Sequence, residues 1–535
     1  MVFQMKERRP KTLVIGVDGF DPDLFSRLIR RGDMPTLGKL TNNGLNGRLK
    51  STIPPSTCPA WVSSVTGVNV GKHGIYDFFT SVDLRNKAVT FANSMKRRAS
   101  AVWNIASRLE KKCIILNVPV TFPPERIEGV MVSGMLTPGL HSDFTYPRSL
   151  KHELLGMGYQ IDIGDTMVNK LLLQQRSEVG LLSKLRELVR TRTLAAEHLM
   201  KEFEWDLFMV VYVALDRLYH LFWRHIDPEH VAHNPTMAKT IYPYISHIHL
   251  ELDRAIGRLL NATGKDANLL LYSDHGFRPL NRILFTNSVL RRMGFLEVRK
   301  SSRISRAISQ ESILKMLVRF HLEGLLDGLP ANKKRRIGNL IRPSDDFASV
   351  TEADPAKTKA FQFGYNYIRI NEDSTSVEEQ TRIEEEVLDL FNNRLSGLFI
   401  RAYRREDLFH GPMVKEMPRI ILESQGDVTP RQLIPVDNRI LMDYDSHSKV
   451  PSLMWNGDHG LYGVIVAAGP SIKNMQPCAN GLCSATAAYQ QTIEANIVDI
   501  APTILEMLGI RTPSLMLGMD GKSIIGKEHT PTHSV

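Results

Sequence analysis

The stretch Leu13-Val14-Ile15-Gly16-Val17-Asp18-Gly19 decides how the rest of the chain is interpreted. Its apolar, mostly β-branched residues are typical of a strand that is buried on both faces of a parallel sheet. Asp18 follows at once, so a carboxylate stands at the carboxyl end of this strand. Open α/β sheets bind ligands at that end of their strands. We therefore expect Asp18 at a functional site, although an aspartate before a glycine is also common in an ordinary turn.

Strands and helices alternate after this segment. Apolar runs predict further strands at 112–118, 207–214, 268–272 and 463–468. Helical spacing of apolar residues predicts helices at 23–31, 34–42, 101–109, 182–203, 246–260 and 499–508. This alternation predicts an α/β fold with a doubly wound, mostly parallel sheet.

Two stretches suggest insertions into this core. Residues 11–290 form the first part of the core, with a helical insertion at 151–204. Over 291–436 the sequence changes to basic helical stretches and an extended segment, which we interpret as an inserted cap or lid. The core then resumes over 437–526, and 527–535 form a loose tail.

The composition is that of a globular protein. Hydrophobic residues make up 43% of the 535 residues and charged residues 23%, which excludes a disordered chain. The net charge of +10 favours anionic partners such as phosphates, nucleotides or nucleic acid. The basic run Lys333-Lys334-Arg335-Arg336 has no interleaved aromatic residues, so it predicts a solvated helix end and no specific nucleic-acid site.

The sequence gives no signal for export or membrane insertion. The N-terminal residues lack the apolar stretch of about 7 to 15 residues that a signal peptide requires. No apolar run reaches the roughly 18 residues of a membrane span. Four cysteines are too few for a disulfide scaffold, and only Cys478 and Cys483 are near enough in sequence to suggest a pair. We expect a cytoplasmic protein with reduced thiols.

Thr57 stands where a helix is expected to begin, in Thr57-Cys58-Pro59-Ala60-Trp61. A threonine there can serve as an N-cap. The same geometry suits catalysis, because free backbone N–H groups at a helix start bind anions. A hydroxyl at this place can attack phosphorus if a metal ion lowers its pKa. The sequence leaves both roles open.

Three Asp–His pairs lie near predicted strands or helices. Asp216 and His220 are four residues apart, so they share one face of a helix and can chelate one metal ion. Asp274-His275 ends the predicted strand at 268–272, and Asp458-His459 precedes the strand at 463–468. Solvated side chains are the alternative for each pair. Together with Asp18 and Thr57, these residues are enough for two divalent cations with open positions.

Motifs for other chemistries are absent or incomplete. The segment Gly67-Val68-Asn69-Val70-Gly71-Lys72-His73 is one residue short of a phosphate-binding loop and lacks its Ser or Thr. The sequence has no Gly-x-Ser-x-Gly elbow, no Cys-x-x-Cys pair and no Gly-x-Gly-x-x-Gly after the first strand. Walker-type nucleotide hydrolysis and serine-hydrolase chemistry are therefore disfavoured.

The order of these candidate site residues along the chain, from Asp18 to His459, resembles that of the alkaline phosphatase superfamily. Within it, the resemblance is to the type I phosphodiesterase and nucleotide pyrophosphatase branch. The resemblance covers about residues 11–150, 205–290 and 437–526. It rests on the segments 14–19, 34–37, 57–67, 72–75, 216–220, 273–276, 459–460 and 499–505.

The resemblance implies a site for two metal ions, with zinc expected and manganese the alternative. Asp216, His220 and His459 would hold one ion. The second ion would be held by Asp18, Asp274 and His275, and Thr57 would bridge both ions as the nucleophile. The implied reaction is hydrolysis of a phosphodiester or nucleotide-type pyrophosphate bond in an anionic substrate, through a phospho-threonyl intermediate.

Some positions depart from that branch. Phe78 and Ala60 stand where relatives that cleave nucleotide diesters carry asparagines, so another donor must serve or the substrate differs. Lys72 or His73 would suit a phosphomonoesterase by binding terminal phosphate oxygens. A phosphomonoesterase or phosphotransferase with the same metals is therefore the enzyme alternative, and a nucleotide-binding protein without turnover is the other. All seven expected site positions are filled, which argues against loss of activity. Whether Asp458 is a ligand or orients His459 stays open.

Overall fold

The computed structural model describes residues 10–86, 88–163, 178–264, 266–299, 347–348, 350–444, 454–472, 492–510 and 518–525. The predictions for Lys333–Arg336, for a Cys478–Cys483 pair and for a tail at 527–535 lie outside these residues. Cys58 and Cys113 are described, and both are free and buried.

The decisive stretch forms β1 (Thr12–Val17), a fully buried strand near the middle of a nine-stranded sheet. Its neighbours β8 (Leu207–Tyr212) and β9 (Asn268–Tyr272) both run parallel to it. The strand order is β22-β2-β21-β9-β1-β8-β5-β6-β7. The remaining strands are β2 (Leu45–Lys50), β5 (Cys113–Leu116), β6 (Gly129–Val132), β7 (Thr145–Tyr146), β21 (Tyr462–Ala468) and β22 (Thr492–Asn496). Only β21 and β7 run antiparallel to their neighbours, which confirms the mostly parallel sheet.

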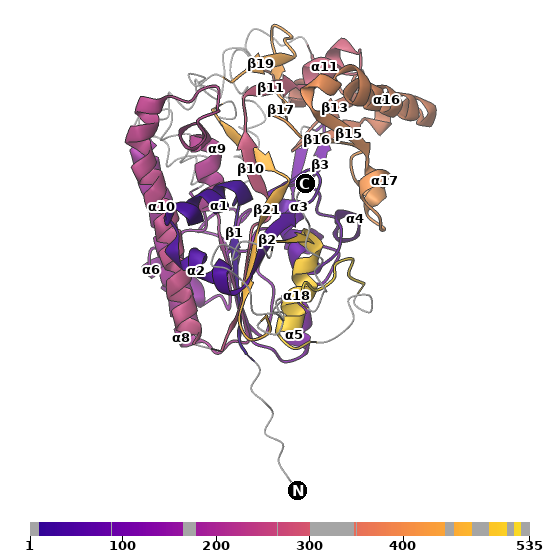
Figure 1. Cartoon of the computed structure of the whole chain (residues 1–535). Coiled ribbons are helices and arrows are strands. Elements are labelled where there is room, and N and C mark those ends of the chain that lie inside the picture. Colours follow the sequence, from indigo (N-terminus) through magenta and orange to yellow (C-terminus); the bar gives the residue numbers. More distant parts are fainter. Residues whose placement is uncertain are drawn as a thin grey trace, which may run out of the picture.

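Helices cover both faces of this sheet, as expected for a doubly wound fold (Figure 1). On one face α8 and α10 pack along each other, and on the other face lie α3 and α18. The helices of the core are α1 (Pro22–Arg31), α2 (Pro35–Asn43), α3 (Thr57–Thr66), α4 (Val70–His73), α5 (Val102–Arg108), α6 (Leu150–Gly156), α8 (Glu178–Glu202), α9 (Ala214–Ile226), α10 (Pro235–Thr263) and α18 (Ile500–Met507).

The helix α10 is longer than the predicted 246–260 because it continues through Pro243. A proline disfavours a helix interior, so the sequence pattern suggested a later start. The Asn234 side chain caps the helix by accepting from Met237 N at 3.0 Å. Ile241 and Ile245 are buried on either side of the proline and anchor the extra turns.

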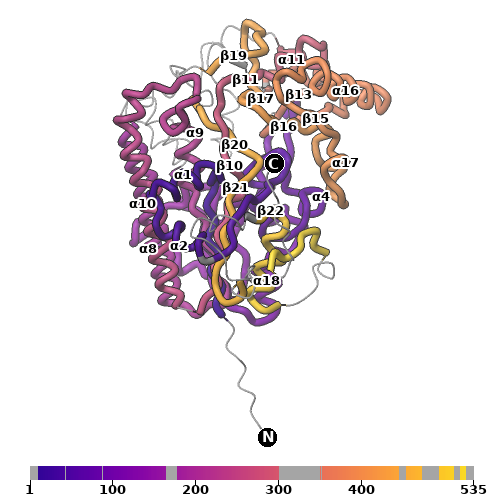
Figure 2. Tube along the Cα trace, viewed as in Figure 1, coloured from indigo at the N-terminus to yellow at the C-terminus, as the bar shows by residue number. Residues whose placement is uncertain are grey.

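A second hydrophobic core is built mainly from residues 350–434. This segment is the orange part of the chain, which lies above the central sheet in Figure 2. Its four-stranded sheet has the order β13-β14-β16-β15, and α16 (Val377–Asp389) packs on it. A three-stranded sheet has the order β17-β11-β19. The strands are β11 (Arg282–Phe285), β13 (Ala360–Gln362), β14 (Tyr367–Ile370), β15 (Ile400–Arg404), β16 (Ile420–Ser424), β17 (Val428–Arg431) and β19 (Leu441–Asp443). We call residues 347–436 of this part the cap; the domain boundaries proposed from the sequence stay a prediction.

The long helices of the molecule are amphipathic elements of the core. Among the described residues, none of them has the length and continuous apolarity that crossing a bilayer requires. The expected cytoplasmic location stays a prediction.

Candidate active site

Side chains from distant parts of the sequence meet at one edge of the central sheet because their strands end there. β1, β8 and β9 are parallel, so Asp18, the start of α9 and Asp274 follow their carboxyl ends. β21 runs antiparallel to β9, and its first residues therefore lie at the same edge. The short strand β20 (Gly457–Gly460), which pairs with β10 (Gly276–Pro279), precedes β21 and brings His459 there.

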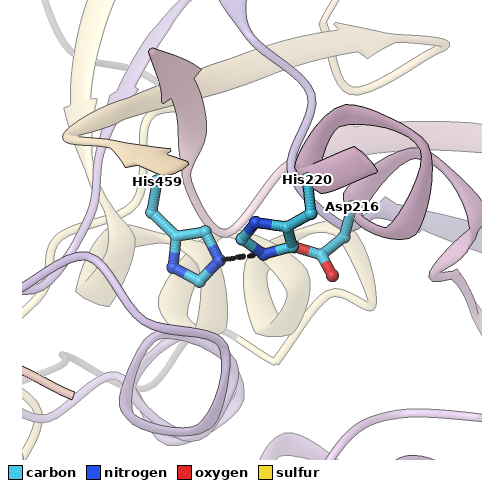
Figure 3. Close-up of side chains that lie close together, drawn as sticks. All are labelled: Asp216, His220 and His459. Atoms are coloured by element: carbon cyan, nitrogen blue, oxygen red, sulfur yellow. Dashed lines mark hydrogen bonds and ion pairs between the residues drawn. The ribbon is translucent and has the colours of Figure 1, made fainter. Parts of the chain in front are cut away.

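Asp216, His220 and His459 form the first cluster, with their side chains pointing toward one another (Figure 3). Asp216 Oδ1 lies 3.2 Å from His220 Nε2 and 3.4 Å from His459 Nε2. The two histidine Nε2 atoms are 3.0 Å apart. All three residues are buried, which excludes the alternative of solvated side chains.

Asp18, Asp274 and His275 form the second cluster. His275 Nε2 lies 3.3 Å from Asp274 Oδ2 and 3.6 Å from Asp18 Oδ1, and none of the three side chains is exposed to solvent. The ring of His275 stacks on that of His459 with 3.7 Å between centroids. The two clusters are therefore in contact.

The outer nitrogen of each histidine is held by the backbone. His220 Nδ1 lies 2.9 Å from Gly457 O, His459 Nδ1 lies 2.9 Å from Pro55 O, and His275 Nδ1 lies 3.1 Å from Gly276 O. A carbonyl only accepts hydrogen bonds, so each Nδ1 must be the donor. In the neutral ring this leaves Nε2 with a lone pair facing the cluster, the arrangement of histidines that bind metal ions.

The inner carboxylate oxygens have no hydrogen-bond donor among the described residues. Asp18 Oδ1, Asp216 Oδ1 and Asp274 Oδ2 are buried and unpaired, and these are the atoms that face the histidines. Buried charges without a partner are costly, whereas carboxylate oxygens and imidazole nitrogens are common ligands of divalent cations. The donor atoms present therefore fit two divalent cations.

The electrostatics of the clusters support this assignment. Burial raises the pKa of Asp18 well above its ordinary value, and repulsion from Asp274 and Asp216 raises it further. Burial and the charge of Asp216 also raise the pKa of Asp274. At Asp216 the effect of burial is outweighed when His220 and His459 are protonated, because their positive charges hold its pKa well below the ordinary value. Carboxylates that repel one another in this way are stabilised by a shared cation.

Thr57 is the first residue of α3, which excludes the N-cap role that the sequence had left open beside the catalytic one. Ser56 is the N-cap residue, although its side chain makes no capping bond. Thr57 is 2% exposed, and its Oγ1 lies 3.4 Å from His275 Nε2. The hydroxyl is therefore directed at the second cluster while it also lines the cavity described below.

Packing against β1 fixes the start of α3. The Trp61 ring lies on Gly16, where an added Cβ would be 2.3 Å from the ring, so no other residue fits that position in the strand. Trp61 Nε1 donates to Asp18 Oδ2 at 3.1 Å. One tryptophan thus positions both the helix that carries Thr57 and the carboxylate of Asp18.

A cavity of ≈ 280 Å³ opens onto the first cluster between the core and the cap. Thr57, Asp216, His220 and His459 line its floor. The cap supplies the facing wall, together with Trp455 and with aromatic and charged residues of the core. The other lining residues are Asp77, Phe78, Phe79, Met135, Arg217, Gln362, Gly364, Tyr365, Pro430, Arg431, Gln432, Leu433 and Trp455.

Asp458 is not part of either cluster. Its buried carboxylate accepts from Arg278 Nη2 at 3.0 Å, from Thr429 Oγ1 at 2.7 Å and from Tyr365 OH at 3.2 Å. Burial raises its pKa, but the charges of Arg431 and Arg278 outweigh that effect and lower it. Asp458 therefore ties the strand of His459 to the cap.

Lys72 and His73 lie away from the cavity. Lys72 Nζ pairs with Asp520 Oδ1 at 2.5 Å. His73 is fully buried, 2.9 Å from Ser63 Oγ, and burial lowers its pKa to about 3, so the ring is neutral. Neither residue is therefore placed to bind phosphate, the role that was the alternative from the sequence. Phe78 lines the cavity, but Ala60 is buried inside α3.

The sequence motifs missed the residues of the cap wall and Trp455. Gln362 and Arg431 are the last residues of β13 and β17, and Tyr365 lies in the turn between β13 and β14. No metal-ligand spacing marks these three positions. Trp455 stacks on His220 with 4.0 Å between centroids. Its position four residues before His459 was the one available signal.

Solved structures share this fold at low sequence identity. An inactive form of murine ectonucleotide pyrophosphatase / phosphodiesterase 5, in complex with AMP, matches 94% of this chain and 95% of its own at 12% identity, with a TM-score of 0.51. Phosphonoacetate hydrolase from Sinorhizobium meliloti 1021, in complex with phosphonoformate, matches 86% of this chain and 90% of its own at 13% identity, with a TM-score of 0.51. These likenesses confirm the fold class.

No curated protein sequence matches the chain. The family model of type I phosphodiesterase / nucleotide pyrophosphatase matches residues 12–428, which confirms the resemblance that the motifs suggested. The chain therefore belongs to the type I phosphodiesterase / nucleotide pyrophosphatase family, a family of phosphoesterases.

Proposed function

We propose that the protein hydrolyses phosphodiester or pyrophosphate bonds, using two divalent cations and Thr57 as the nucleophile. The observation that carries this proposal is the contact of two buried Asp/His clusters beside one threonine hydroxyl at the floor of a cavity. Asp216, His220 and His459 would hold one cation, and Asp18, Asp274 and His275 the other. We expect zinc, with manganese as the alternative.

The cations would supply Lewis acidity, which lowers the pKa of the Thr57 hydroxyl and offsets charge on the phosphoryl oxygens. Thr57 Oγ1 then forms a bond to phosphorus while the bond to the leaving oxygen breaks, and the proton of the hydroxyl ends on the departing alcohol or phosphate. Water hydrolyses the resulting phospho-threonine and restores the hydroxyl. The free N–H groups at the start of α3 favour an anion beside Thr57.

The cavity supports a substrate with an organic group on either side of phosphorus. Phe78, Tyr365 and Trp455 line it and offer apolar surface beyond the reacting centre. Lys72 and His73 are engaged elsewhere, which weakens the phosphomonoesterase alternative. The filled site positions weaken the alternative of a nucleotide-binding protein without turnover.

The proposal is tested by hydrolysis of bis-p-nitrophenyl phosphate and p-nitrophenyl phosphate. The purified protein is treated with a chelator and assayed with zinc or manganese added back. Diester cleavage restored by metal supports the proposal, and a preference for the monoester supports the phosphomonoesterase alternative. Turnover of neither ester by the metal-loaded protein would contradict the proposal.

A further inference from the structure

The cap places an arginine in the wall of the cavity without a hydrogen-bond partner for one of its donors. Arg431 is the last residue of β17, and its Nη2 is buried and donates to nothing among the described residues. A buried guanidinium nitrogen that is left unpaired is costly, because it has lost its water. Arg431 is therefore suited to bind an anionic oxygen that enters the cavity.

The nearby carboxylate does not use this donor. Asp458 lies close enough to feel the charge of Arg431, but its hydrogen bonds come from Arg278, Thr429 and Tyr365. The other arginine of the cavity differs in this respect, since Arg217 Nη2 pairs with Asp162 Oδ2 at 2.7 Å.

Aromatic packing holds Arg431 in line with the first cluster. Its guanidinium carbon lies 5.7 Å from the centre of the Trp455 ring, and Trp455 in turn stacks on His220. A cation over an aromatic face is attracted to the ring and restricted in orientation. The row from His220 through Trp455 to Arg431 thus leads from the proposed reaction centre to the cap.

A second polar group of the cap faces the same cavity. Gln362 is 1% exposed, and its Oε1 accepts no hydrogen bond among the described residues. Its backbone is fixed by Asn287, whose side chain accepts from Gln362 N at 2.6 Å and donates to Gln362 O at 3.1 Å. The backbone of Gln362 is thus fixed, and its buried amide oxygen is available to accept from an O–H or N–H group.

We propose that Arg431 and Gln362 determine specificity by binding one organic substituent of the phosphoester. This substituent carries a second anionic group, which binds Arg431, and a hydroxyl or amino hydrogen, which is donated to Gln362. This inference rests on the proposed function. The anionic group can be a carboxylate or a phosphate, since a guanidinium binds both. Arg431 acts on substrate binding and takes no part in bond making or breaking.

A matched series of diesters tests the charge preference. Each diester joins phosphate to p-nitrophenol and to a second alcohol: 3-hydroxypropanoate, propan-1-ol or 3-aminopropan-1-ol. All release p-nitrophenol, so the readout is the same for an anionic, an uncharged and a cationic substituent. A fourth diester with propane-1,3-diol monophosphate distinguishes phosphate from carboxylate as the preferred anion. A fifth, with glycerate, adds one hydroxyl to the anionic substituent.

We expect the wild-type kcat/KM to be at least about tenfold higher for the anionic than for the cationic diester, a difference of the size measured for one charge-assisted hydrogen bond. Arg431→Met should remove most of this ratio, and Arg431→Glu should reverse it. Arg401→Glu is the control, because Arg401 is exposed on β15 and lies outside the cavity. This substitution changes the net charge by the same amount as Arg431→Glu. The wild type should prefer the glycerate diester to the 3-hydroxypropanoate diester, and Gln362→Met should lose this preference.

The outcomes separate the two proposals. If the wild type cleaves none of the diesters, the proposed function fails. If the wild type cleaves them, two results would show that the specificity inference is wrong while the function stands. In the first, Arg431→Glu lowers kcat/KM for all the diesters by one common factor. In the second, Arg431→Glu leaves the ratio of anionic to cationic kcat/KM at the value found for Arg401→Glu. Circular dichroism and bound-metal analysis establish that each variant is folded, and Arg431→Met provides the test if Arg431→Glu does not fold.

Discussion

His220 Nε2 lies 3.0 Å from His459 Nε2, although helix α9 carries the first residue and strand β20 the second, 239 positions later in the chain. Each ring donates from Nδ1 to a backbone carbonyl, so the two nitrogens that meet are both acceptors in the neutral rings. Two facing lone pairs repel each other unless a proton or a cation lies between the rings and Asp216. This contact is the most direct indication of a cation site in the molecule.

Removing one histidine should remove one metal ion. We expect His459→Ala to bind one zinc ion fewer per chain than the wild type, because the first cluster loses one of its three ligands. Metal analysis after dialysis against limiting zinc measures the change. His249→Gln is the control, since His249 is equally buried but lies 2.9 Å from Tyr219 OH, outside both clusters. An unchanged metal content in His459→Ala would contradict the assignment of this cluster.

Adjacent hydroxyls allow a sharp test of the nucleophile. Thr57→Ala should lower kcat for diester hydrolysis by at least about 10³-fold, as expected for loss of a nucleophile, with both metal ions retained. Ser56→Ala is the matched control, because Ser56 is also buried and its Oγ has no hydrogen-bond partner among the described residues. Steady-state kinetics should show Ser56→Ala within a few-fold of the wild type. Equal losses in the two variants would mean that the helix start, and not the Thr57 hydroxyl, is required.

Much of the core could be predicted from sequence, because its central strands β1, β8 and β9 are mostly apolar runs that are followed by ligand residues. The pattern around β1 predicted a buried parallel strand, and the α9 spacing predicted that Asp216 and His220 share a helix face. Parallel pairing then requires strand ends to meet at one edge. The cap could not be predicted in this way, since its wall residues come from the ends of the short strands β13 and β17 and from the turn after β13, whose contacts depend on how the cap packs on the core.

Asp458 should affect stability rather than metal binding. Asp458→Ala leaves Arg278 without its buried carboxylate partner, and breaking a buried ion pair costs about 3 to 5 kcal/mol. Urea denaturation at saturating zinc should show a loss of this size, with the metal content unchanged. Asp23→Ala removes the exposed ion pair with Arg48 and should cost less than about 1 kcal/mol. Loss of a metal ion in Asp458→Ala would instead indicate that Asp458 is a ligand.

The role of Asp458 could not be read from the sequence because a β-strand alternates its side chains. Asp458 and His459 are neighbours in β20, so they point to opposite faces, and only one of them can face the first cluster. The sequence pattern Asp-His at this position does not say which. Arg278 and Thr429, which bind Asp458, are distant in sequence and belong to other strands.

Asp77 should make stability depend on pH near neutrality. Its buried carboxylate lines the cavity and accepts from Phe78 N at 2.7 Å and from Tyr365 N of the cap at 3.0 Å. Burial is the main cause that raises its pKa from 3.8 to about 7. Folding therefore favours the protonated form. This contribution to stability is complete below pH 3.8 and is lost as the pH rises to 7, at about 1.4 kcal/mol per unit in that range.

Comparison with Asp77→Asn isolates this contribution, because asparagine does not titrate and the metal ligands titrate alike in both proteins. The free energy of unfolding of the wild type, minus that of the variant, should fall by about 2 kcal/mol or more between pH 5 and pH 8. In the control Asp83→Asn this difference should not fall, since hydrogen bonds from Asn86 lower the pKa of the exposed Asp83. If the difference in free energy of unfolding between the wild type and Asp77→Asn stays constant across this range, the Asp77 carboxylate is ionised throughout. A positive charge in the cavity would then have to offset the effect of burial.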